Sequence, residues 1–193
     1  MGLVDRVKNI LLNPRQEWSV IDTEPATVGE LFTGYVVPLA AIPPISQAIG
    51  YSVFGISVPF LGTYRTPVGS ALASAAVTYV LSLAGVYVLA LIIDALAPNF
   101  GGTKSQIQAL KVAAYSSTAS WVAGIFALIP GLRFLSILGV YSLFLLYLGL
   151  PVLMKTPPEK ALPYTAVVIL AAIVLFAVVG LVAGRFMAIP MGG

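Results

Sequence analysis

The chain has 193 residues, of which 59% are hydrophobic and only 9% are charged, with 10 Lys and Arg against 7 Asp and Glu. Soluble domains carry about 25% charged residues, so this composition predicts an integral membrane protein. The sequence contains no Cys and no His. Disulfides and thiol nucleophiles are therefore excluded, and the residue that most often serves as metal ligand or general base is absent.

Residues 1–27 are expected to form a cytoplasmic or interfacial N-terminal segment, followed by a transmembrane domain over residues 28–193. Apolar residues occur between the first charges at helical spacing: Leu3, Val4, Val7, Ile10 and Leu11. This pattern predicts a short amphipathic helix in the headgroup layer. Thr27 and Glu30 have the spacing of a capping box, which predicts that the first membrane helix begins here.

The rest of the chain contains long intervals without Asp, Glu, Lys or Arg: Leu31–Tyr64, Thr66–Ile93, Val112–Leu132, Phe134–Met154 and Ala161–Gly184. A helix needs about 20 apolar residues to cross the hydrocarbon core, so each interval can supply one span. The sequence therefore predicts an all-α bundle of five transmembrane helices. Because Pro38, Pro43 and Pro44 interrupt the first interval, we interpret it as one kinked crossing. A re-entrant return through residues 51–64 is the alternative.

The basic residues indicate an orientation for these five helices. One side of the membrane would hold Arg6, Lys8, Arg15, Lys104, Lys111, Lys155 and Lys160. The other side would hold Arg65, Arg133 and Arg185. Basic residues accumulate in cytoplasmic loops, so this bias predicts a cytoplasmic N-terminus and an external C-terminus.

The third predicted span has one polar face, because Gln108, Lys111, Tyr115 and Thr118 follow one another in steps of three and four residues. Two interpretations are open: a polar cavity or solute path, and hydrogen bonding between helices, which we favour. Asp94 and Lys111 flank the loop that joins the second and third spans. We expect these two residues to form an ion pair that fixes the loop.

The end of the fourth span combines Pro151, which should loosen the last helical turn, with Lys155 and Lys160. The two lysines would join three basic residues of the N-terminal segment: Arg6, Lys8 and Arg15. Such a basic rim attracts anionic lipid headgroups. In the fifth span, Gly180 and Gly184 allow close helix contact, either within the chain or in a homo-oligomer.

Several motifs occur in a fixed order along nearly the whole chain: Pro14…Trp18, Phe100-Gly101-Gly102, Lys111…Tyr115-Ser116, Trp121…Gly124…Ile129-Pro130, and Tyr147-Leu-Gly-Leu-Pro151 followed by Lys155-Thr-Pro157 and Glu159-Lys160-Ala161. This order resembles the prokaryotic branch of the Yip (Ypt/Rab-interacting-protein) family; Ala119 departs from it where relatives often carry proline. The resemblance implies five membrane helices, a cytoplasmic N-terminus and a prokaryotic cytoplasmic membrane. A Rab partner is not carried over, because the long cytoplasmic N-terminal region of eukaryotic relatives is lacking, and the resemblance implies no settled activity.

We predict a non-enzymatic protein that organises the membrane or binds lipid or protein partners at its cytoplasmic face. A small transporter or channel with a polar path beside the third span is the alternative. No motif supports Ser–Lys catalysis by Ser116 and Lys111. We expect no catalytic, cofactor-binding or metal-binding residue and no nucleic-acid partner. The candidate functional residues are Asp94, Phe100, Gly101, Gly102, Lys111, Tyr115, Ser116, Pro151, Lys155 and Lys160.

Overall fold

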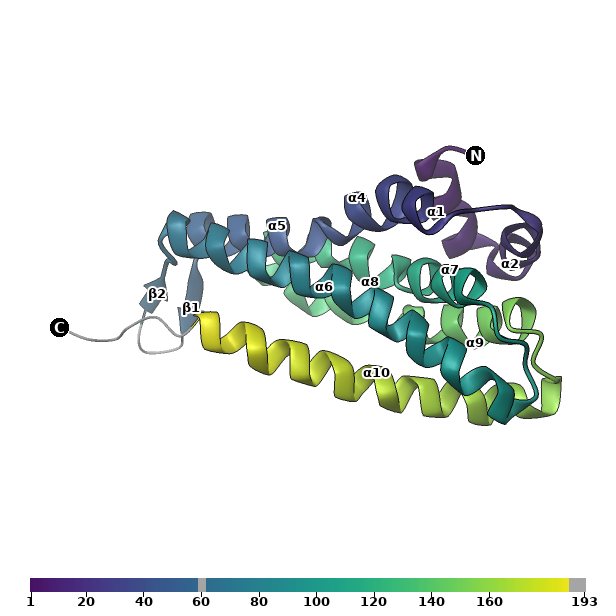
Figure 1. Ribbon diagram of the computed structural model, residues 1–193. Coiled ribbons are helices and arrows are strands. Elements are labelled where there is room, and N and C mark those ends of the chain that lie inside the picture. The colour runs from purple at the N-terminus through teal and green to yellow at the C-terminus, as the bar shows by residue number, and fades with distance from the viewer. Residues whose placement is uncertain (59–61, 188–193) are drawn as a thin grey trace.

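The computed structural model describes the backbone of residues 1–58 and 62–187 and the side chains of residues 1–55 and 62–181. The expectations for Gly184 and Arg185 concern contacts outside the described side chains. Helical segments run back and forth between the two ends of an elongated bundle (Figure 1). This arrangement places residues that are distant in sequence at a common end.

The two ends of the bundle differ in composition. One end carries α1 (Leu3–Leu12), α2 (Pro14–Thr23) and the connections that follow α6 and α9, and we call it the basic end (Figure 1). The other carries an antiparallel hairpin of β1 (Ile56–Val58) and β2 (Gly62–Tyr64), and we call it the hairpin end. The paired residues of the hairpin are Ile56 with Tyr64, Ser57 with Thr63 and Val58 with Gly62. These strands are an exception to the predicted all-α fold.

The first segment is one helix with changes of pitch. It comprises α3 (Val28–Leu31), η1 (Phe32–Val36), α4 (Val37–Ala40), α5 (Ile42–Ile49) and η2 (Gly50–Phe54). The expected capping box is present, since the Glu30 N–H donates to Thr27 Oγ1 over 3.2 Å and the Thr27 N–H donates to the Glu30 carboxylate over 2.9 Å. Pro38 and Pro43 lie in the first turns of α4 and α5, where a missing N–H is best tolerated. Strand β1 follows this segment after Gly55.

Among the described residues, four helices are long and apolar enough to cross a membrane: Val28–Phe54, Val68–Phe100, Pro130–Leu153 and Pro158–Leu181. The expected span over residues 112–132 is not one of them, so the count of five is not confirmed. That region forms α7 (Gln106–Ser116), α8 (Thr118–Ala123) and η4 (Gly124–Leu128), with a break at Ser117. Ser117 Oγ donates to the carbonyl of Ala113 over 2.7 Å, and such back-bonding competes with the helical ladder and bends the helix.

The other long helices follow along the chain. They are α6 (Val68–Leu96), continued by η3 (Ala97–Phe100), then η5 (Pro130–Val140), α9 (Tyr141–Leu153) and α10 (Pro158–Met187). Helix α6 packs against both α7 and α10, and α7 packs against α9. The outer surface is largely apolar and exposes Val80, Leu91, Phe134, Ile137, Leu162, Leu170 and Val174. A continuous apolar surface of this kind is typical of a chain surrounded by lipid.

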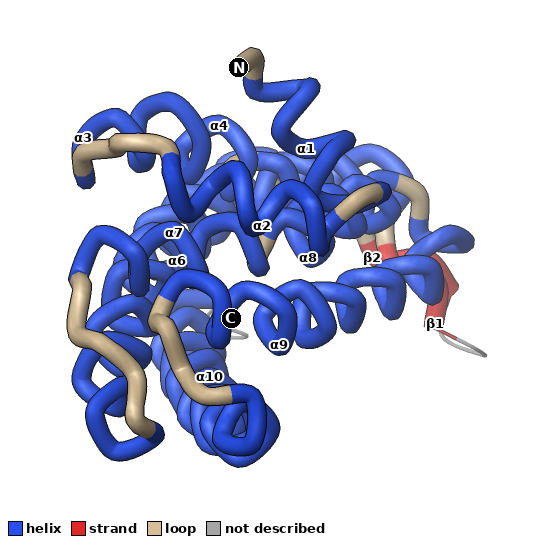
Figure 2. The backbone as a smooth tube through the Cα atoms, turned by 90° about the vertical axis from the view of Figure 1, so that its right-hand side faces the viewer, coloured by secondary structure: helices blue, strands red, loops and turns tan. Residues whose placement is uncertain are grey.

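The first two helices lie across the basic end of the bundle (Figure 2). Helix α1 matches the expected amphipathic helix, but its apolar side packs against protein: Ile10 is fully buried, while Leu3, Val7 and Leu11 contact the core. Of the apolar residues that define the pattern, only Val4 is largely exposed. The sequence patterns did not predict α2, which packs against α9. The apolar side of α1 is therefore largely covered by the protein itself.

Candidate functional site

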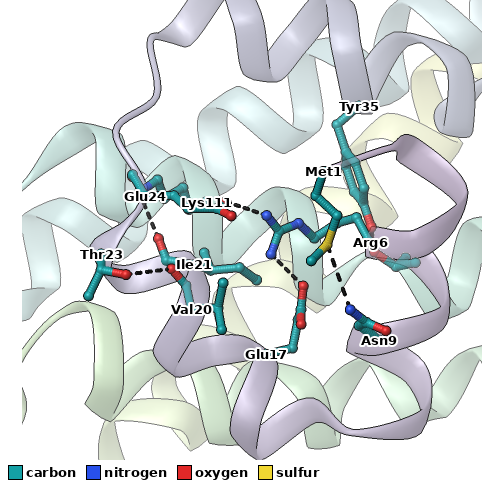
Figure 3. Close-up of polar contacts among 11 residues, drawn as sticks. Met1, Arg6, Asn9, Glu17, Val20, Ile21, Thr23, Glu24, Tyr35 and Lys111 are labelled. Carbon is teal, nitrogen blue, oxygen red and sulfur yellow. Dashed lines mark hydrogen bonds and ion pairs between the residues drawn. The ribbon is translucent and has the colours of Figure 1, made fainter.

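Arg6 is the centre of a buried group of charges at the basic end (Figure 3). Its guanidinium forms ion pairs with Glu17 of α2 and with Glu24, the residue that follows α2. It also lies over the ring of Tyr115 in α7, 5.6 Å from the ring centroid, in a cation–π arrangement. One side chain thereby joins α1, α2 and α7. We call Arg6, Glu17, Glu24 and Lys111 the charge cluster.

The surroundings of Arg6 keep its side chain positively charged. Burial acts to lower the pKa of Arg6, but the hydrogen bond to Glu24 and the neighbouring charges outweigh burial and raise the pKa above its usual value. A buried cation whose charge is balanced in this way serves to hold elements together. Arg6 is therefore not available for the basic rim that the sequence predicted.

Lys111 binds the end of α2 and does not pair with Asp94. Its ammonium donates to the carbonyl of Ile21 over 2.9 Å and to that of Glu24 over 2.5 Å. These carbonyls belong to the negative end of the α2 dipole, where a cation is stabilising. No ion pair between described residues joins Lys111 to Asp94, so that prediction is wrong. Helix α2, which the sequence did not reveal, supplies the partners instead.

Asp94 lies near the end of α6, on the side where α10 packs. Its Oδ1 atom is buried without a hydrogen-bond partner among the described residues. The neighbouring Ile93 carbonyl accepts a hydrogen bond from Tyr164 of α10, and Phe100 stacks on the Tyr164 ring with centroids 4.9 Å apart. Phe100 and Tyr164 therefore fix a joint between α6 and α10, whereas the expected ion pair would have fixed the loop between the second and third spans.

The polar face of α7 and α8 is occupied by contacts with other parts of the chain. Gln108 Nε2 donates to the carbonyl of Asp22 over 3.2 Å, and Tyr35 forms a 2.7 Å hydrogen bond with Thr118. Tyr115 lies between the rings of Trp18 and Tyr35, with centroids at 6.3 and 4.6 Å. Among the described residues, this face makes hydrogen bonds between helices, the interpretation that the sequence favoured.

The two connections at the basic end meet each other. Gly101 has a left-handed backbone, with φ of 72°, and a Cβ at Gly102 would lie 2.8 Å from the carbonyl oxygen of Met154. Glycine is thus required at both positions, by conformation and by close approach. Lys155 pairs with Asp22 over 2.5 Å, whereas Lys160 is exposed. The loop motifs that the sequence singled out therefore form one contact region.

A cavity and a groove lie beside the helices α7 and α8. A polar cavity of about 340 Å³ adjoins the charge cluster and is lined by Arg6, Glu24, Tyr35 and Tyr115 among others. An apolar groove of about 680 Å³ lies on the side facing α6 and α10, and Ser116, Ser117 and Ser120 contribute to its lining. Thr118 lines neither space. Among the described residues, no three carboxylates gather closely enough to hold a metal ion.

Sequence reasoning missed Glu17, Trp18, Asp22 and Glu24 as partners of the candidate residues. One local signal was available: Pro14 with an acidic residue one turn later is typical of a helix start, and Glu17 lies in the first turn of α2. This signal would have predicted α2 but not what it contacts. The pairing with Arg6 and Lys111 depends on how α2 lies against α1 and α7.

The comparisons with known proteins agree with the motifs. The family model of the Yip1 domain matches residues 8–179. Inner membrane protein YohC of Escherichia coli strain K12 is 29% identical over 167 residues, which cover 84% of this chain and 86% of the relative. The protein of the same name from Escherichia coli O6:H1 is similar to the same extent. No solved structure matches the chain.

Proposed function

The chain belongs to the Yip1 domain family, as its motifs predicted, and on that premise we propose that it organises the membrane without catalysing a reaction. Its basic end would bind anionic lipid headgroups. The similarity to an inner membrane protein and the four apolar helices make it a membrane protein. The family supplies no reaction, so the argument for lipid binding rests on the surface of this chain.

The exposed charges of the basic end carry the proposal. Its exposed basic side chains are Lys8, Arg15, Lys104, Lys155 and Lys160. Arg6 and Lys111, which the sequence placed on the same side, are buried and have partners within the protein. Each basic residue near a membrane surface attracts anionic lipids by about 1 kcal/mol. Several such residues beside an apolar bundle favour a headgroup-binding surface.

The proposal is tested by changing Lys8, Lys104, Lys155 and Lys160 together to Gln. We expect the protein to enrich phosphatidylglycerol over phosphatidylcholine from mixed vesicles, and the variant to lose most of this enrichment at low salt. High salt should reduce the difference, because it screens exposed charges. Mass spectrometry of the lipids retained by the purified protein measures the enrichment at low and at high salt. Arg65→Gln, an exposed cation at the hairpin end, is the control, and unchanged enrichment in the lysine variant would contradict lipid binding.

We propose further that the interrupted segment α7–η4 is a fifth span and that the basic end is cytoplasmic. In support, the segment runs between the same two ends as its neighbours (Figure 1), and the basic residues gather at one of them. Because the sequence contains no Cys, single cysteines report the side directly. With a membrane-impermeant thiol reagent on intact cells, we expect labelling of Arg65→Cys and none of Lys104→Cys. The reverse pattern would contradict the orientation.

A small transporter or channel has less support. The polar side chains of α7 and α8 bond to other helices, and the hydroxyls of Ser116 and Ser117 donate to the Ala113 carbonyl. The protons of these hydroxyls are therefore engaged within the helix, which leaves only their oxygens to contact a solute. Proton or ion flux into liposomes that contain the purified protein would favour the transporter, and we expect none.

A further inference from the structure

A cleft of about 330 Å³ opens beside α2, on the surface outside the charge cluster. Arg15 and Trp18 of α2 form one wall, and Tyr147 and Pro151 of α9 contribute to the opposite wall. The start of α10 adds Ala161. The cleft thus combines one cation, two aromatic rings that carry polar groups, and apolar side chains.

Trp18 contributes a buried indole ring to one wall of the cleft. The residue is 0% exposed, yet its Nε1 has no hydrogen-bond partner among the described residues. A Cβ at Gly149 would lie 2.6 Å from Cζ2 and 2.8 Å from Cε2 of the indole. The indole therefore packs tightly against the backbone of α9 at Gly149. Because Nε1 is closed to solvent, the ring contributes to the cleft as an apolar wall and as a fluorescent reporter.

Arg15 supplies a charge without a partner in the described part of the chain. The residue is exposed, and it takes part in none of the ion pairs between described residues. The acidic residues nearest to it in α2 are engaged elsewhere, since Glu17 pairs with Arg6 and Asp22 with Lys155. A free guanidinium is suited to phosphate, because its planar fork matches two oxygens.

The cleft lies where the apolar outer surface of the bundle begins. Tyr147, which lines the cleft, is 40% exposed. Phe144 of α9 and Leu162 of α10, which are close in sequence to lining residues, are 42% and 67% exposed. Trp and Tyr are enriched at the headgroup level of membrane proteins. A ligand with an anionic head and an apolar chain therefore matches both parts of the cleft, whereas a soluble phosphate would use only the first.

We propose that this cleft binds one membrane phospholipid by its phosphate. Arg15 donates to the phosphate oxygens, and an acyl chain lies along α9 past Pro151, beside the wall that Trp18 forms. This inference rests on the proposed function, since it names the ligand class at one place on the basic end. It is more specific than the attraction of lipid by scattered lysines, because it requires a defined site.

The test uses Trp18 as the reporter. The sequence has two tryptophans, so Trp121→Phe leaves Trp18 as the remaining one. In this background, phosphatidylglycerol with brominated acyl chains, added to the protein in detergent, should quench Trp18 fluorescence at low lipid fractions. Arg15→Gln should weaken the apparent affinity about tenfold, as expected for loss of a charged hydrogen bond. Arg65→Gln, which removes an exposed cation at the hairpin end, should leave the affinity unchanged.

Two further arms identify the ligand chemistry. Brominated diacylglycerol lacks the phosphate and should quench Trp18 weakly, with no effect of Arg15→Gln. Glycerol 3-phosphate should not relieve the quenching; if it did so at low concentration, the site would take a soluble phosphate and the lipid assignment would be overturned. Equal quenching by both lipids would overturn the phosphate site. In that case the proposed function would still be tested independently by the variant in which four lysines are changed to Gln, because that variant retains Arg15.

Discussion

The N-terminal helices α1 and α2 are attached to the bundle by buried charges in addition to apolar side chains, whereas the long helices α6 and α10 are joined mainly by apolar and aromatic contacts. Arg6 and Lys111 bind carboxylates and carbonyls of α2 and its C-terminal cap. Between α6 and α10 the polar contact is the hydrogen bond from Tyr164 to Ile93, beside which Phe100 stacks. The attachment of α1 and α2 thus uses charged side chains, whereas that of α6 to α10 uses a tyrosine hydroxyl and a backbone carbonyl.

The difference follows from the surroundings of each joint. In lipid, apolar side chains gain little by leaving the acyl chains, so helices such as α6 and α10 rely on close packing and a few hydrogen bonds. Helices α1 and α2 belong to the polar N-terminal part and lie at the end of the bundle, where charges are tolerated. Once buried there, these charges must be paired, because an uncompensated buried charge is strongly destabilising.

The largest effect is expected for Arg6→Gln, which leaves Glu17 and Glu24 without their cation. Breaking a buried pair from one side costs about 3–5 kcal/mol, so the free energy of unfolding in detergent should fall by this amount. Adding Glu17→Gln should recover part of the loss. The matched control, Lys8→Gln on the exposed side of the same helix, should stay within about 0.5 kcal/mol. An equal effect of both single changes would contradict the difference between the joints.

Lys111→Gln should cost about 1.5–3 kcal/mol, the range for hydrogen bonds to charged groups. Asp94→Asn should have a much smaller effect, because Asp94 Oδ1 has no hydrogen-bond partner among the described residues to lose. In a double-mutant cycle on thermal stability, the two changes should be additive within about 0.5 kcal/mol. A larger coupling energy would support the ion pair between Asp94 and Lys111 that the sequence predicted.

Gly149→Ala tests the packing of α2 on α9, because the new Cβ would lie 2.6 Å from Trp18. Overpacking of this kind costs about 1–3 kcal/mol. Gly85→Ala in α6 is the matched change at the other joint, where the nearest atom is Phe176 Cε1 at 3.4 Å. It should be close to neutral in the same unfolding measurement. A reversed order would show that α6 and α10 form the tighter contact.

The smallest effect is expected for Lys155→Gln. Its partner Asp22 lies at the surface, and the Lys155 side chain is 55% exposed. Exposed pairs contribute at most about 1 kcal/mol and are screened by salt. The unfolding free energies of the variant and the parent should therefore converge at high salt. A loss as large as that of Arg6→Gln would mean that the connection after α9 is as important as the buried charges.

The local features of the fold could be predicted because neighbouring residues determine them. The capping box at Thr27 and Glu30 forms as expected, and long intervals without charges form long helices. The break at Ser117 was missed because length and hydropathy say nothing of hydroxyls that bond back to the Ala113 carbonyl. Helix α2 was missed because its polar sequence has no apolar run, although Pro14 marks its start.

The sequence by itself determined that the chain is an apolar helical membrane protein of a recognisable family, because composition and motif order are properties of the chain alone. The tertiary structure decided which charges are paired and which are free. Arg6 and Arg15 are both N-terminal cations, yet one is buried between two carboxylates and the other is exposed. This outcome depends on the packing of α2 against α1, α7 and α9, and charge spacing along the sequence does not contain it.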